Sequence, residues 1–151
     1  GWGCVDGATH TFNAMLGITH RGMSTALSAL IHDEVYAEII GDGVHVSDDA
    51  LKLFFKAKPE DKVILISDAL PITYSDMKET VFADSKIYYD GDKATSADGT
   101  IAGSTKLLPE IIKILGKKGM FKPRFIENTY RYHGLEPIGE IEWDEDFNPR
   151  F

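Results

Sequence analysis

Short apolar runs alternate with amphipathic segments along the first half of the chain. Residues 4–12 predict a strand that ends at His10, and YAEII at 36–40 predicts another. KVILIS at 62–67 is almost continuously apolar, which is typical of a strand covered on both faces. Helices are predicted between these strands, at 24–33 with Ser24 as its N-cap and from 48 with Ser47 as its N-cap. The face of the first helix is predicted to carry Ala26, Leu27, Leu30 and Ile31.

The second half of the chain predicts a hairpin followed by two helices. A hairpin is predicted within 80–98, with Asp90, Gly91 and Asp92 as its turn. Two helices are then expected, at 103–119 and 123–132, and the acidic tail from 138 is short and β-leaning. Strands that alternate with helices predict parallel βαβ units and an α/β fold.

Polar residues follow the three predicted parallel strands. In such sheets, ligands bind beyond the carboxyl ends of the strands. His10, His45 and Asp68 each come at or just after one of these ends. Because the three ends lie along one edge, the three side chains are predicted to share a site.

Charge and cysteine content limit the kinds of partner and the cellular compartment that fit this chain. The net charge of −8 argues against a nucleic-acid backbone as partner, but is compatible with a small phosphorylated ligand. Cys4 is the single cysteine, so an intramolecular disulfide is impossible, which fits the cytoplasm. No apolar run reaches the roughly 18 residues that a membrane span needs, and no signal peptide is visible. The chain begins at Gly1, which leaves open that it is part of a longer protein.

Each candidate residue also has a structural interpretation when taken alone. A histidine after a strand is commonly a loop or core residue, Asp68 alone could cap a turn, and Arg21 alone could be a solvated charge. Together, two imidazoles and a carboxylate suit metal-assisted hydrolysis, in which imidazole binds the metal and the carboxylate moves protons. Glycine-rich segments such as GDG and AGS let backbone N–H groups approach a polar ligand.

Five motifs carry a resemblance to a known family. ATHTFNAM, the loop around Arg21, DGVH, ISDA and DGTIAGST occur in this order over roughly residues 6–116. In these motifs the chain resembles the C-terminal portion of the N-acetylglucosamine-6-phosphate deacetylases of the amidohydrolase superfamily. The resemblance implies an α/β fold that is the C-terminal part of a (β/α)₈ TIM-type barrel, with about three βα units and an inserted hairpin. Residues 1–134 would be barrel, and 135–151 a remnant of a small β-sandwich domain.

The resemblance also implies roles for individual residues. His10 would be a metal ligand and Asp68 the catalytic acid and base. Arg21 would reach the phosphate across the interface of a homodimer. The other substrate-binding residues implied are Asn13, Ala14, Asp42, Gly43, Val44, His45, Ile101, Ala102 and Gly103.

The implied reaction is metal-dependent hydrolysis of N-acetylglucosamine 6-phosphate to glucosamine 6-phosphate and acetate. A barrel needs about 250 residues, whereas this chain has 151 and only three predicted barrel strands. The divalent metal ion, zinc or iron, would need further ligands that this chain lacks, and the chain would require the missing N-terminal half. Three alternatives remain: an inactive fragment, a self-associating or sugar-phosphate-binding module, or an amidohydrolase acting on another N-acetyl amino sugar.

Overall fold

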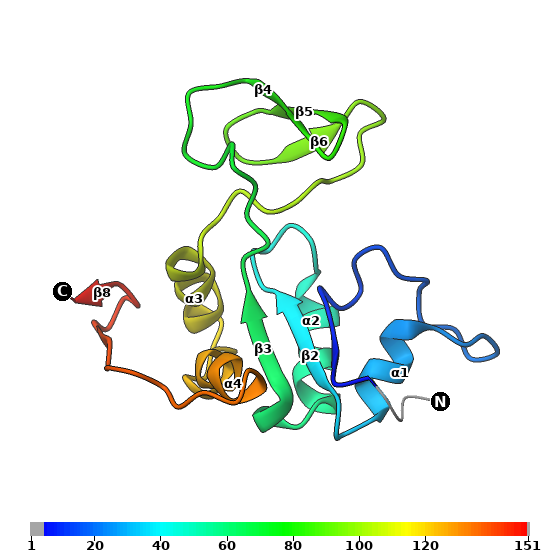
Figure 1. Cartoon of the computed structure of the whole chain (residues 1–151), viewed down its shortest axis with the longest axis vertical. Coiled ribbons are helices and arrows are strands. Elements are labelled where there is room, and N and C mark those ends of the chain that lie inside the picture. Colours follow the sequence, from blue (N-terminus) through cyan, green and yellow to red (C-terminus); the bar gives the residue numbers. More distant parts are fainter. Residues whose placement is uncertain (1–4, 151) are drawn as a thin grey trace.

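A computed structural model describes residues 5–150 of the chain, so Cys4 lies outside the described residues. Three parallel strands form the main sheet: β1 (Gly7–Ala8), β2 (Tyr36–Ile40) and β3 (Val63–Ile66). Their order in the sheet is the order in the sequence, with Ala8 opposite Ala37 and Ala37 opposite Val63. The connections carry α1 (Thr25–Ile31), and then α2 (Asp48–Ala57) with a 3₁₀ turn at Glu60–Lys62 (Figure 1). The predicted parallel βαβ arrangement and α/β class are therefore confirmed.

A small antiparallel sheet stands beyond the carboxyl ends of β2 and β3 (Figure 1). It consists of β4 (Glu79–Phe82), β5 (Ser85–Tyr89) and β6 (Ala94–Ser96). The predicted hairpin is β5–β6, and its turn is held by Asp90, whose Oδ1 accepts hydrogen bonds from the backbone N–H groups of Asp92 and Lys93. Strand β4 was not predicted, because ETVF lies between polar residues and is almost fully exposed.

Two helices and a short hairpin complete the chain. These are α3 (Leu108–Lys117), α4 (Arg124–Tyr132), and the pair β7 (Glu142–Trp143) and β8 (Pro149–Arg150). The tail hairpin lies beside α3 in Figure 1, and the Phe147 ring reaches Gly116 of that helix. Across residues 5–150, no helix combines the length and apolar character needed to cross a bilayer.

The main core lies on one face of the parallel sheet. Ala37 and Ile39 of β2 and Val63 and Leu65 of β3 point to this face, because alternate residues of a strand share a face. They pack with side chains from all four helices: Leu30, Leu51, Phe54, Ile111, Ile112, Leu115 and Phe125. The opposite face carries Tyr36 and Glu38, and Tyr36 meets the ring of Tyr132 at a centroid distance of 5.1 Å.

Two boundary predictions were wrong. The strand predicted over 4–12 is only Gly7–Ala8, because His10, Phe12 and Ala14 have positive φ, which a strand cannot accommodate. The helix predicted from 103 begins at Leu108, with Pro109 in its first turn. The preceding residues instead form a bridge between Ser104 and Ala69.

The helix caps agree with the sequence. Ser24 accepts a hydrogen bond from Leu27 N, and Ser47 accepts one from Ala50 N. Ile31, however, is 64% exposed rather than on the buried face of α1. Ala29 takes part in that face instead and is fully buried.

Candidate functional site

The carboxyl ends of the three parallel strands are where the candidate residues gather. His10 lies two residues beyond β1, His45 five beyond β2, and Asp68 two beyond β3. Since the strands are parallel and adjacent, all three residues follow the same edge of the sheet (Figure 1). The structure therefore places them at one edge, as the sequence predicts.

The loop after β2 is organised by one carboxylate. Asp42 Oδ1 accepts hydrogen bonds from the backbone N–H groups of Val44 and His45, both at 2.9 Å. Its other oxygen, Oδ2, lies 2.8 Å from Nδ1 of the His45 ring. Gly43 has a φ of +79°, so a residue without a Cβ suits this tight turn. DGVH is thus a self-contained loop that presents an imidazole.

The His45 ring connects this loop to a distant part of the chain. Its Nε2 lies 2.7 Å from the carbonyl oxygen of Ala102. Burial lowers the pKa of His45, but the hydrogen bonds and charge of Asp42, the Ala102 carbonyl and the charge of Asp68 outweigh that effect and raise it. Burial likewise acts to raise the pKa of Asp42, yet the hydrogen bonds from His45 and Val44 lower it to about 2. Asp42 and His45 therefore form a buried, hydrogen-bonded pair in which each favours the charged form of the other.

Asp68 lies against the same distant segment. Its carbonyl oxygen accepts a hydrogen bond from Ser104 N at 2.8 Å, and Leu70 N donates to Ser104 O at 2.8 Å. A Cβ on Gly103 would stand 2.6 Å from the carbonyl oxygen of Asp68, so this close approach needs glycine. The Asp68 side chain stays exposed. Asp68, with its exposed side chain, is thus held beside Gly103 and Ser104, while Ile101 is 41% exposed.

His10 is oriented by its own turn. Its Nδ1 lies 3.1 Å from the carbonyl oxygen of Asn13, so Nδ1 is placed to donate to that oxygen, which leaves Nε2 for another partner. The Asn13 side-chain amide donates back to the carbonyl of His10 at 3.4 Å, and Ala14 is exposed with a φ of +53°. A histidine whose second nitrogen is held by a carbonyl is the usual arrangement for a metal ligand.

The structure does not complete a metal site. Within residues 5–150, no cluster of three or more His, Cys, Asp or Glu side chains is arranged to hold a metal ion. Arg21 lies in an exposed loop, and no contact within the described residues joins its guanidinium to His10, His45 or Asp68.

Sequence reasoning missed Glu38. Its Oε2 accepts a hydrogen bond from Thr9 Oγ1 at 2.5 Å, and the backbone N–H of His10 lies 3.4 Å from the same oxygen. Glu38 thereby ties the turn that carries His10 to β2. A charged residue at the centre of the apolar run YAEII was the available signal.

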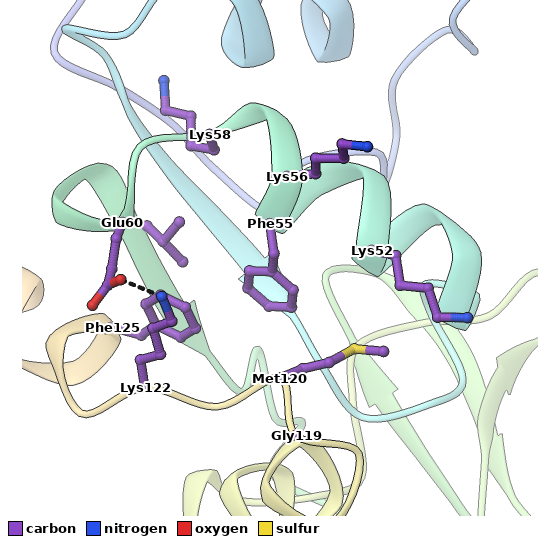
Figure 2. A pocket seen from close by; sticks show the side chains of 10 residues that line it. Lys52, Phe55, Lys56, Lys58, Glu60, Gly119, Met120, Lys122 and Phe125 are labelled. Atoms are coloured by element: carbon purple, nitrogen blue, oxygen red, sulfur yellow. Dashed lines mark hydrogen bonds and ion pairs between the residues drawn. The ribbon is translucent and has the colours of Figure 1, made fainter.

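A pocket of about 310 Å³ lies elsewhere, between α2 and the α3–α4 connection (Figure 2). Phe55 and Phe125 stack in it with ring centroids 5.1 Å apart, and Lys122 forms an ion pair with Glu60 at its rim. The pocket reaches Val63, the first residue of β3, whereas Asp68 follows the last one. It is therefore separate from the candidate site.

Comparison with known proteins adds independent findings. No protein-family model matches the chain. Over 98 residues, 64% of its length, it is 39% identical to N-acetylglucosamine-6-phosphate deacetylase of Bacillus subtilis. Over 100 residues it is 32% identical to N-acetylgalactosamine-6-phosphate deacetylase of a Shewanella species. Its fold matches the crystal structure of N-acetylglucosamine-6-phosphate deacetylase from Pasteurella multocida with a TM-score of 0.78, at 27% identity over 95% of the chain.

The chain resembles the C-terminal portion of the N-acetylglucosamine-6-phosphate deacetylases. The resemblance inferred from its motifs is thus confirmed. The matched segment spans about a quarter of each of the two curated deacetylases and 42% of the Pasteurella chain.

Proposed function

We propose that this chain carries the C-terminal part of a deacetylase site that hydrolyses N-acetylglucosamine 6-phosphate to glucosamine 6-phosphate and acetate. The observation that carries this proposal is the meeting of Asp68, the Asp42–His45 pair and residues 102–104, within the segments that match deacetylases. A general acid and base beside a hydrogen-bonding imidazole is what amide hydrolysis of an anionic sugar needs.

The parallel sheet fits a barrel segment. Strands that follow one another in sequence order, each joined by a helix, are the repeating unit of a (β/α)₈ barrel. We propose that residues 1–134 belong to such a barrel, and that 135–151 are a remnant of a small β-sandwich domain. The N-terminal half of the barrel would complete the site, in a homodimer located in the cytoplasm.

His10 fits a divalent metal ion, zinc or iron, through its free Nε2. Such an ion would supply Lewis-acid activation of water and of the acetamide carbonyl. Because residues 5–150 contain no group of three or more His, Cys, Asp or Glu side chains arranged to hold a metal ion, the remaining ligands would come from the N-terminal half.

The residues of this chain would transfer the proton and bind the substrate. Asp68 would accept a proton as water attacks and return it to the departing sugar nitrogen, because an amide anion is a poor leaving group. His45 would contact the substrate. The predicted binding residues Asn13, Ala14, Arg21, Gly43 and Val44 would hold the ligand, and Ile101, Ala102 and Gly103 would close over the acetamido group.

The match to a Shewanella relative also supports a second substrate, N-acetylgalactosamine 6-phosphate. The Shewanella relative, at 32% identity, is named for N-acetylgalactosamine 6-phosphate, which differs from the first substrate only at the sugar C4 hydroxyl. The two sugars should therefore be compared in the same assay.

The test is acetate release by the natural protein that contains this sequence. We expect release from N-acetylglucosamine 6-phosphate, with one new primary amine per acetate. Asp68→Asn should keep substrate binding but lower turnover by about 10²–10⁴-fold, the usual loss for a general acid–base residue.

Asp76→Asn is the matched control, because Asp76 is an exposed aspartate in the same connection. It should leave turnover unchanged. Full turnover in Asp68→Asn would contradict the role of Asp68. Ligand binding without any acetate release would favour a sugar-phosphate-binding module instead.

A further inference from the structure

The Asp42 carboxylate is occupied by its own loop. Its oxygens accept hydrogen bonds from Val44 N, His45 N and His45 Nδ1, and its side chain is only 2% exposed. A sugar hydroxyl therefore meets the ring of His45 rather than this carboxylate. The resemblance implied that Asp42 binds the substrate. Because its oxygens are already occupied, Asp42 is better suited to orient His45, which would contact the substrate.

The His45 ring lies between two hydrogen-bond acceptors. Nδ1 faces the Asp42 carboxylate at 2.8 Å, and Nε2 faces the Ala102 carbonyl at 2.7 Å. A neutral imidazole has one N–H and could donate to only one of them, whereas an imidazolium donates to both. Only 7% of the His45 side chain is exposed, so water cannot readily take the place of either partner.

Ala102 belongs to a segment that borders Asp68. Ser104 donates to the carbonyl of Asp68, and Ala102 N donates to Ala94 O in the small sheet at 2.9 Å. The hydrogen bond from His45 Nε2–H to Ala102 O, called here the His45 tether, therefore joins the loop after β2 to residues 102–104 and through them to Asp68.

We propose that Asp42 is a positioning residue that holds His45 as an imidazolium, and that the His45 tether fixes residues 102–104 beside Asp68. The inference rests on the proposed function, since it assigns these residues to the substrate site. Because both N–H groups are in use, a substrate oxygen can bind His45 only by displacing the Ala102 carbonyl. Substrate contact and release of the tether are then one event.

The experiment uses ¹⁵N-histidine NMR on the whole chain. The charged groups that act on His45 are Asp42 and Asp68, so the titration should cover pH 5–9. In the unaltered protein, both ring nitrogens of His45 should be protonated at pH 7. A neutral His45 ring at pH 7 overturns the proposal without reference to any variant.

Two variants test whether Asp42 orients His45 or is needed only for the chain to fold. Asp42→Asn should make the His45 ring neutral at pH 7 and speed hydrogen exchange of the Ala102 and Ser104 amides at least tenfold. Amides of β2 and β3 should stay protected, which shows that the fold persists. Glu34→Gln removes the carboxylate beside the half-buried His32, 3.3 Å from its Nδ1, and should change neither readout.

Unchanged exchange at Ala102 and Ser104 in Asp42→Asn would overturn the proposal. Addition of N-acetylglucosamine 6-phosphate then tests the proposed function separately. We expect shifts of the His45 Nε2 and Ala102 signals together. If neither signal shifts while His45 is an imidazolium, the substrate assignment fails although the tether stands.

Discussion

At the scale of single residues, the candidate site depends on backbone conformations that most side chains avoid. His10, Ala14 and Asp68 have φ values of +32°, +53° and +49°. Such conformations cost on the order of 1–3 kcal/mol each and occur preferentially at functional sites. Hydrogen bonds around them, such as Asn13 N to His10 O at 2.9 Å and Ser104 N to Asp68 O at 2.8 Å, offset part of this cost.

Gly103→Ala tests the close approach of two backbone segments. The new Cβ would lie 2.6 Å from Asp68 O and 3.0 Å from the Leu70 side chain, so the backbone must move. We expect a loss of about 1–3 kcal/mol in the free energy of unfolding, measured with urea. Gly17→Ala is the control, because nothing lies within 4 Å of its added Cβ, and it should change stability by less than about 0.5 kcal/mol.

The Asp42–His45 ion pair should make stability depend on pH. The pKa of Asp42 falls from 3.8 to about 2 on folding, so its contribution is present above pH 4 and is lost as the pH falls through 2. The pKa of His45 is raised, so its contribution is full below its ordinary value of 6.5 and is lost as the pH rises through the folded value.

We therefore expect the free energy of unfolding to decline at both ends of the pH range, by roughly 2 kcal/mol on the acid side from Asp42. Urea unfolding from pH 2 to 9 measures this. His45→Gln should flatten the limb above neutral pH. An equally steep limb in that variant would show that another group causes it.

At the scale of elements, α1 is held at both ends. Ser24 caps its start, and the ammonium of Lys58 donates to Ala29 O at 2.8 Å and to His32 O at 2.6 Å near its end. Lys58 is 3% exposed, and burial lowers its pKa. Lys58, the residue that ends α2, thus holds the end of α1 through carbonyl groups 26 and 29 positions earlier in the chain.

Lys58→Met should leave two carbonyl oxygens near the end of α1 without their donor. We expect a loss of about 2 kcal/mol, because an unsatisfied buried acceptor costs 1–3 kcal/mol. Thermal and urea unfolding provide the measurement. Lys56→Met changes an exposed lysine two residues away and should cost less than about 0.5 kcal/mol. Equal effects of the two variants would argue against a capping role for Lys58.

At the scale of the whole molecule, residues 5–150 contain two separate hydrophobic cores. The main one covers the face of the parallel sheet, and a second consists of Leu70, Ile72, Ile87 and Ala94 under the small antiparallel sheet. A core of four residues supports little cooperative stability on its own. The small sheet nevertheless positions residues 102–104, because Ala102 N donates a hydrogen bond to Ala94 O of β6.

Ile87→Ala should therefore act locally. Ile87 is 3% exposed, and its truncation typically costs 2–5 kcal/mol. Hydrogen exchange should accelerate in β4, β5 and β6 while the amides of β2 and β3 keep their protection. Leu65→Ala, in the main core, should accelerate exchange in both sheets. Loss of protection throughout the chain in Ile87→Ala would show that the two cores unfold together.

Much of the fold was predictable because its signals are local. Short apolar runs defined β2 and β3, and serines defined the starts of α1 and α2. The end of β1 was not predictable, since the positive φ of His10 and Phe12 depends on contacts with β2, among them Thr11 N to Glu38 O at 2.8 Å. Residues 103–107 were also misassigned, because a bridge to Ala69 competes with helix formation there.

The sequence alone determined the parallel βαβ order, the edge at which His10, His45 and Asp68 lie, and the resemblance to deacetylases, because these depend on periodicity and motif order. Only the tertiary structure decided that Asp42 faces His45 rather than solvent, that His45 reaches Ala102, and that Gly103 adjoins Asp68. These contacts join residues up to 57 positions apart. Packing of the two sheets sets such distances, and no local pattern of residues encodes them.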